Sequence, residues 1–179
     1  RLEKERLEKE RLENERLKTE LEEVRLENER LKTELERAKP ICTDTKLVER
    51  WRRKIGKNTK FNLSGNKIGD EDAKAIAEAL KTNKTLTALW LSGNKIGVEG
   101  AKTIAGSLKI NKTLTTLNLD SNQIGENGSK AIAEALKTNK TLTKLDLRGN
   151  TIGVEGAKAI VEALKTNKTL TELWLSGNQ

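Results

Sequence analysis

A 28-residue pattern recurs from residue 58 to the end of the chain. Three consecutive copies read NKTLTALWLSGNKIGVEGAKTIAGSLKI (83–110), NKTLTTLNLDSNQIGENGSKAIAEALKT (111–138) and NKTLTKLDLRGNTIGVEGAKAIVEALKT (139–166). Self-similarity at such a period predicts a stack of supersecondary units, in which each unit buries its apolar face against the next. Stacks of this kind offer extended binding surfaces, so the repeat predicts a binding role before any single residue is considered.

Each copy joins a strand pattern to a helix pattern. Leu89 and Leu91 lie two residues apart, as on one face of a short strand. Ala101, Ile104 and Leu108 follow at intervals of three and four residues, as on one face of a helix. One strand and one helix are therefore expected in every repeat.

The motif L-x-x-L-x-L-x-x-N-x-I-G, which runs from Leu86 to Gly97 in one copy, resembles the leucine-rich repeat family. The likeness is to the 28-residue type of ribonuclease inhibitor, NOD-like receptors and Ran GTPase-activating protein. It implies an α/β solenoid with parallel strands on a concave face and helices on a convex face. The asparagine of the motif is expected to be buried and to bond turn backbone. It occurs as Asn66, Asn94, Asn122, Asn150 and Asn178.

Composition divides the chain into residues 1–39, 40–57 and 58–179. The first segment is almost wholly Arg, Leu, Glu, Lys and Asn, mostly strong helix formers, and Pro40 ends it. The second is a junction with a short helix, whose Trp51 is expected to cover the open first layer of the stack. The third is the solenoid. Because the chain lacks methionine and ends directly after a strand pattern, we expect it to be a piece of a longer protein.

Within the first segment, apolar and asparagine residues alternate by three and four from residue 14 onward, which is a heptad seam. Glutamates at g positions would face Lys or Arg at e positions in a parallel pair, whereas an antiparallel pair would oppose glutamates. The pattern resembles leucine zippers and predicts a parallel homodimer through residues 13–39; a single charged helix is the alternative. The seam comprises Asn14, Leu17, Leu21, Val24, Asn28, Leu31 and Leu35.

Several kinds of chemistry are disfavoured by composition. The chain has no histidine and one cysteine, Cys42, which argues against most zinc sites, histidine-based triads and an intrachain disulfide. We find no nucleophile–base pair, metal cluster or phosphate loop, and so expect no enzymatic activity, cofactor or small-molecule substrate. No apolar stretch is long enough to cross a membrane and no signal-peptide pattern opens the chain, so a cytoplasmic location is expected.

The net charge of +8 is concentrated at the junction. Nucleic acid or anionic lipid could bind such a basic region. No aromatic residue is interleaved for stacking on bases, and a solvated capping helix is the favoured interpretation. We therefore expect neither a nucleic-acid nor a membrane partner.

Asn-Lys-Thr recurs at Asn83, Asn111, Asn139 and Asn167, and each is formally a glycosylation sequence. A glycosylated, secreted solenoid is one interpretation. The favoured alternative is a polar turn between helix and strand, in which the asparagine adopts the left-handed conformation of a helix C-cap.

Variable positions between the repeated core residues identify the candidate binding surface. Strand residues that point away from the core include Trp90 and Trp174. Leaving such a side chain in water forgoes roughly 1.5–3 kcal/mol of burial, and tryptophan is enriched at binding hot spots. The alternative is that each ring lies over a neighbouring aliphatic stem. We predict a protein-binding site on the concave face, with charges between the rings, formed by Trp90, Trp174, Asn118, Asp146, Asp120, Lys144 and Arg148.

The leading functional hypothesis is a protein–protein interaction module, paired by the coiled coil and presenting its concave surface to a protein partner. The resemblance suggests part of a NOD-like-receptor-type sensor or scaffold in the cytoplasm. One alternative is a small-GTPase regulator resembling Ran GTPase-activating protein. Another is a structural or engineered repeat with no specific ligand, which the near-identity of the repeats favours slightly.

Overall fold

The computed structural model describes residues 15, 18–19, 22, 25–26, 30 and 44–179. The chain divides into two compact units, residues 1–40 and 41–179. In the first unit, the described residues are helical. The predicted zipper seam lies outside the described residues: Asn14, Leu17, Leu21, Val24, Asn28, Leu31 and Leu35.

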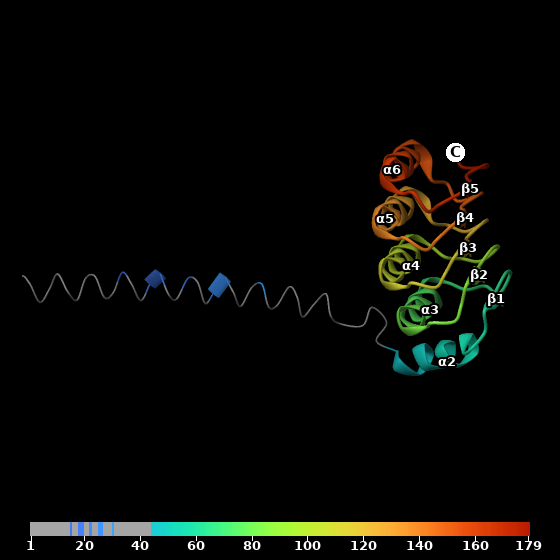
Figure 1. Ribbon diagram of the computed structural model, residues 1–179, viewed down its shortest axis with the longest axis horizontal. Helices are drawn as coiled ribbons and strands as arrows, with labels where there is room; N and C mark the ends of the chain where they lie inside the picture. The colour runs from blue at the N-terminus through green and yellow to red at the C-terminus, as the bar shows by residue number, and fades with distance from the viewer. Residues whose placement is uncertain (1–14, 16–17, 20–21, 23–24, 27–29, 31–43) are drawn as a thin grey trace, which may run out of the picture. The chain divides into compact units, whose positions relative to one another are not determined.

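The second unit alternates short strands with longer helices (Figure 1). A first helix, α2, precedes the repeats. The elements are α2 (Thr45–Ile55), β1 (Lys60–Asn62), α3 (Asp70–Thr82), β2 (Ala88–Trp90), α4 (Val98–Ile110), β3 (Thr116–Asn118), α5 (Gly125–Thr138), β4 (Lys144–Asp146), α6 (Gly153–Thr166) and β5 (Glu172–Trp174).

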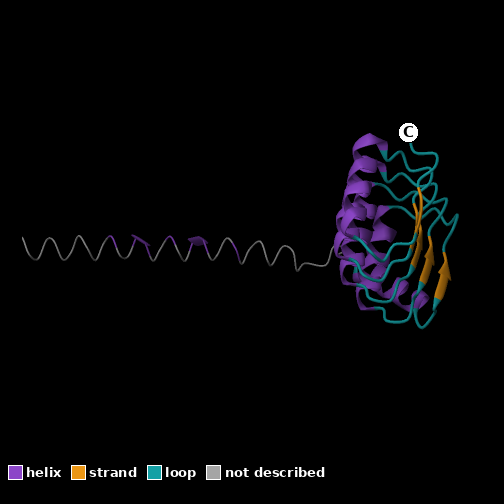
Figure 2. Cartoon of the chain, turned by 45° about the horizontal axis from the view of Figure 1, so that its top comes forward, coloured by secondary structure: helices purple, strands orange, loops and turns teal. Residues whose placement is uncertain are grey.

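All five strands form one parallel sheet in the order of the sequence, β1-β2-β3-β4-β5. Each residue pairs with the equivalent residue of the next repeat, as Leu89 does with Leu117. The helices α3–α6 lie together on one side of the sheet (Figure 2). The predicted α/β leucine-rich repeat solenoid is confirmed, and we call the sheet surface that faces away from the helices the concave face.

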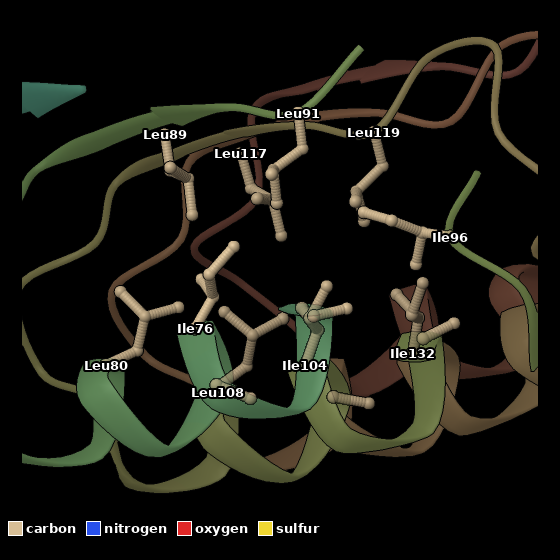
Figure 3. Close-up of a cluster of buried hydrophobic side chains, with 14 of the residues drawn as sticks. Ile76, Leu80, Leu89, Leu91, Ile96, Ile104, Leu108, Leu117, Leu119 and Ile132 are labelled. Carbon is tan, nitrogen blue, oxygen red and sulfur yellow. The ribbon is translucent and has the colours of Figure 1, made fainter. Parts of the chain in front are cut away.

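The core lies between the sheet and the helices (Figure 3). Leu89 and Leu117 point inward from the strands toward Ile76 and Ile104 of the helices, and all four are at most 1% exposed. Aliphatic layers of this kind repeat along the stack, so burial by one repeat depends on the presence of the next.

The asparagine of the motif bonds the turns of adjacent repeats. Asn94 donates from Nδ2 to the carbonyls of Leu63 (2.9 Å) and Leu91 (2.8 Å). Its Oδ1 accepts from the amide of Ile68 at 3.0 Å. Asn122, Asn150 and Asn178 make the same inter-repeat bond to a carbonyl 31 residues earlier. Asn66 lies at the first repeat and is exposed instead.

The Asn-Lys-Thr asparagines form a second ladder, and the prediction of a left-handed cap was wrong. Asn111 has φ −63° and ψ 135°, which is extended backbone. Its Oδ1 accepts from the amides of Thr113 and Leu114, and its Nδ2 donates to the Leu80 carbonyl of the previous repeat at 2.8 Å. In this extended conformation both ends of the side-chain amide reach backbone groups. Asn139 and Asn167 make equivalent bonds, whereas Asn83 donates to the carbonyl of Gly56, which ends α2, at 3.0 Å.

Helix α2 lies against α3. The Asp44 side chain caps α2 by accepting from the Leu47 amide at 2.9 Å. Trp51 is 5% exposed and donates from Nε1 to Asp72 Oδ1 at 3.0 Å. Its indole thus covers apolar surface while its one polar atom is bonded to the first helix of the stack.

Candidate binding surface on the concave face

The third residue of each strand points away from the core, and the register places these residues in one row across the sheet. Trp90 pairs with Asn118, Asn118 with Asp146, and Asp146 with Trp174. Trp174 is 40% exposed and Trp90 is half-buried. The alternation of in and out along each short strand is what places both rings on this surface.

Both tryptophans line one hollow of about 290 Å³. Two rings three strands apart therefore bound a shared space rather than two separate surfaces. Asp120 is the one residue of the predicted site that does not line the hollow. It follows Asn118 by two residues in the sequence. The complete lining consists of Trp90, Thr116, Leu117, Asn118, Lys144, Asp146, Arg148 and Trp174.

Asp146 is buried, with 6% of its side chain exposed, and it forms a bidentate ion pair with Arg148. The guanidinium donates from Nε to Oδ1 at 3.0 Å and from Nη2 to Oδ2 at 2.6 Å. Asp146 Oδ1 also accepts from the Arg148 amide at 3.1 Å, and Oδ2 accepts from Asn118 Nδ2 at 3.3 Å. Asp146, and to a smaller extent Asp120, raises the pKa of Arg148. The carboxylate therefore orients the guanidinium at the wall of the hollow.

Two further charges are paired across neighbouring strands. Lys144 of β4 and Glu172 of β5 lie opposite each other, with Nζ 2.6 Å from Oε1, and both side chains are about half exposed. Asp120 Oδ1 accepts from Ser121 Oγ at 3.0 Å. The predicted site thus contains one ion pair with a buried carboxylate, Asp146 with Arg148, and one exposed cation, Lys144, that is paired with Glu172.

In the row across the sheet, every residue except the two tryptophans has a side-chain oxygen that bonds the turn after its strand. Asn62, Asn118 and Asp146 each accept a hydrogen bond from the backbone amide two residues later, at 2.9, 2.9 and 3.1 Å. This bond stabilises the turn that follows the strand. Trp90 and Trp174 have no side-chain acceptor for it. Two repeats therefore carry an indole where the turn itself favours Asn or Asp, a signal that was visible in the sequence but not recognised there.

Among the described residues, no group of three or more His, Cys, Asp or Glu side chains could hold a metal ion. Within that same part of the chain, no helix is long and apolar enough to cross a bilayer. Every buried side-chain nitrogen and oxygen there has a hydrogen-bond partner.

The sequence profile of the leucine-rich repeat matches residues 59–77, 82–105, 111–133 and 138–161. The chain belongs to the leucine-rich repeat family. No curated protein matches this leucine-rich repeat chain. Among solved structures, it is similar to leiomodin-1 actin-binding site 2, with 34% identity over 73% of this chain and 77% of that one, at a TM-score of 0.66. The tropomodulin C-terminal domain of Caenorhabditis elegans shares the fold at 16% identity, covering 75% of this chain and 83% of that one, with a TM-score of 0.64.

The leucine-rich repeats and the likeness to leiomodin-1 together support a protein-binding module.

Proposed function

We propose that the concave face binds a protein partner at the hollow between Trp90 and Trp174. The observation that carries this proposal is that both rings line the same hollow, and both stand where the turns favour Asn or Asp. Large, partly desolvated aromatic side chains that line one hollow are typical of binding hot spots. The ion pair of Asp146 and Arg148 adds a fixed charge at the wall of the hollow.

Actin is the first partner to test, because the similar solved structure is an actin-binding site of leiomodin-1. The full chain and its Trp90→Ala/Trp174→Ala variant would be compared in pull-down of monomeric actin and in co-sedimentation with filaments. We expect wild-type binding and at least a tenfold loss in the double variant, because truncation at a hot spot removes about 2 kcal/mol or more. Val161→Ala is the matched control, since Val161 is 58% exposed on α6. Equal binding by all three chains would remove the concave face from consideration.

We further propose that a parallel coiled coil over residues 13–39 pairs two chains. The pair would present two copies of the concave surface and so bind a multivalent partner with higher avidity. Leu21→Lys/Leu31→Lys places like charges along the seam and should abolish pairing. Light scattering would give the mass of two chains for the wild type and of one for the variant. A single-chain mass for both would contradict pairing.

A role in a NOD-like-receptor-type sensor or scaffold in the cytoplasm is the finer form of this proposal. The buried amides of the Asn-Lys-Thr ladder support only the cytoplasmic location over a glycosylated, secreted one, because a glycan on Asn111, Asn139 or Asn167 would break the bonds that join repeats. The alternative of a small-GTPase regulator predicts stimulated GTP hydrolysis in a panel of small GTPases. Absence of both binding and stimulation would favour the structural alternative.

A further inference from the structure

Among the charged groups that line the hollow between the tryptophans, the unused hydrogen-bonding capacity consists of donors. Its carboxylate, Asp146, already accepts from the amide, Nε and Nη2 of Arg148 and from Asn118. A guanidinium has five N–H donors and an ammonium three. The side chains of Arg148 and Lys144 are each 46% exposed and engage only part of that capacity. Asp120 and Glu172 do not line the hollow. The charged groups left to meet a partner within the hollow are therefore cationic donors, beside the uncharged hydroxyl of Thr116.

The spacing of the two rings selects a backbone conformation for the partner. Trp90 is on β2 and Trp174 on β5, three strand spacings apart, which is about 14 Å. In an extended segment, residues i, i+2 and i+4 point to the same side, and i lies about 13 Å from i+4. On a helix, same-face residues at i+7 and i+11 lie about 10.5 and 16.5 Å away, which brackets the distance without matching it.

We propose that the hollow binds an extended protein segment of the pattern apolar–x–acidic–x–apolar. Its two apolar side chains pack on Trp90 and Trp174, and its central carboxylate accepts hydrogen bonds from Arg148 and Lys144. Arg148 is held for this task by Asp146, so little side-chain freedom is lost when the carboxylate arrives. This inference rests on the proposed concave-face function and specifies the chemistry of the partner.

The test is selection from a displayed library of random 12-residue peptides on the immobilised full chain. Peptides that bind Trp90→Ala/Trp174→Ala equally well are discarded. We expect the remainder to carry Asp or Glu midway between two apolar residues four positions apart. The best peptide, made synthetically, should bind the wild type at least tenfold more tightly than its Asp→Asn or Glu→Gln counterpart in fluorescence anisotropy, because charge-assisted bonds are about twice as strong as neutral ones.

Two variants of the chain assign the acid to its partners. On Arg148→Ala, the acidic and amide peptides should bind within about twofold of each other, since a coupling between two groups disappears when either is removed. Because Arg148→Ala leaves Asp146 buried without its cation, Lys144→Gln serves as the second variant. It keeps the ion pair of Asp146 and Arg148, and it should reduce the difference in affinity between the acidic and the amide peptide.

The outcomes separate this inference from the function on which it rests. Peptides that depend on the tryptophans but carry a basic or uncharged centre, or a seven-residue apolar spacing, overturn the inference and leave the concave-face function intact. Equal affinity of the acidic and amide peptides for the wild type does the same. Failure to select any peptide that depends on the tryptophans overturns the inference, whereas the concave-face function is decided separately by the actin experiments with the wild type and its Trp90→Ala/Trp174→Ala variant.

Discussion

Two sets of asparagines and their neighbours show how differently this chain treats its interior and its concave face. The ladder residues, such as Asn122 and Asn111, recur in every repeat, and all but Asn66 of the first repeat bond backbone across the repeat boundary. The row on the concave face changes from Asn to Trp to Asp between repeats with the same register. Positions fixed by backbone bonding cannot vary without loss of the stack, whereas the row can. Candidate functional residues are therefore the ones at positions that differ between repeats, such as the row on the concave face.

The largest effect is expected inside the ladder. Asn122→Ala removes the donor to the carbonyls of Leu91 and Leu119, at 2.9 and 3.0 Å, and the acceptor of the Ile96 amide. Each buried group left without a partner costs about 1–3 kcal/mol, so we expect at least about 3 kcal/mol of lost stability in urea unfolding. Asn66→Ala is the matched control, because Asn66 occupies the same motif position but is exposed. Equal losses for the two would mean that burial of the ladder is not what stabilises the stack.

A smaller effect is expected where helices of adjacent repeats touch. A Cβ added at Gly128 would lie 2.7 Å from Ile124 Cγ2 and 2.9 Å from Ala101 Cβ, so Gly128→Ala forces the helices apart and should cost about 1–3 kcal/mol. Gly106 of α4 has no atom within 4 Å of its added Cβ, so Gly106→Ala should stabilise by up to about 1 kcal/mol through helix propensity. The two variants should shift the unfolding temperature in opposite directions if the close packing of adjacent helices determines the effect. Shifts of the same sign would contradict a tight helix contact at Gly128.

On the concave face the expected change in stability is smaller still. Trp174→Asn removes a ring that is 40% exposed and restores the acceptor that Asn62 and Asn118 supply to their turns. We expect the free energy of unfolding to change by less than about 1 kcal/mol while partner binding falls at least tenfold. Asn62→Ala is the reciprocal control, because it removes the same bond, to the Ser64 amide, without removing a ring or a residue that lines the hollow. A large loss of stability in Trp174→Asn would assign the indole a structural role.

The sequence was sufficient to predict the repeats, the strand–helix order and the Asn94-type ladder, because each depends on local period and on a motif that recurs. It was insufficient for the second ladder, because a helix-ending asparagine suggests a left-handed cap unless the carbonyl of the previous repeat is known to lie within reach of its Nδ2. The bidentate ion pair of Asp146 with Arg148 could not be predicted either. Two side chains on the same outward face of a strand and turn can point to solvent or to each other, and only the three-dimensional arrangement distinguishes these.

The smallest effect concerns the exposed glutamate–lysine pairs of the convex helices. Hydrogen bonds from Lys137 and Lys158 lower the pKa of Glu134 and of Glu155, and the bond from Lys165 lowers that of Glu162. A lowered folded-state pKa stabilises the fold above the ordinary glutamate value, and this contribution is lost as pH falls through the lowered value. The triple variant with Gln at these positions should unfold at a slightly lower temperature than the wild type at pH 7 and low salt. That difference should shrink as pH falls below the ordinary glutamate value, as these groups become protonated, and should also shrink in 1 M salt, because exposed pairs are screened. A difference that grows as pH falls would mean that the pairs oppose folding.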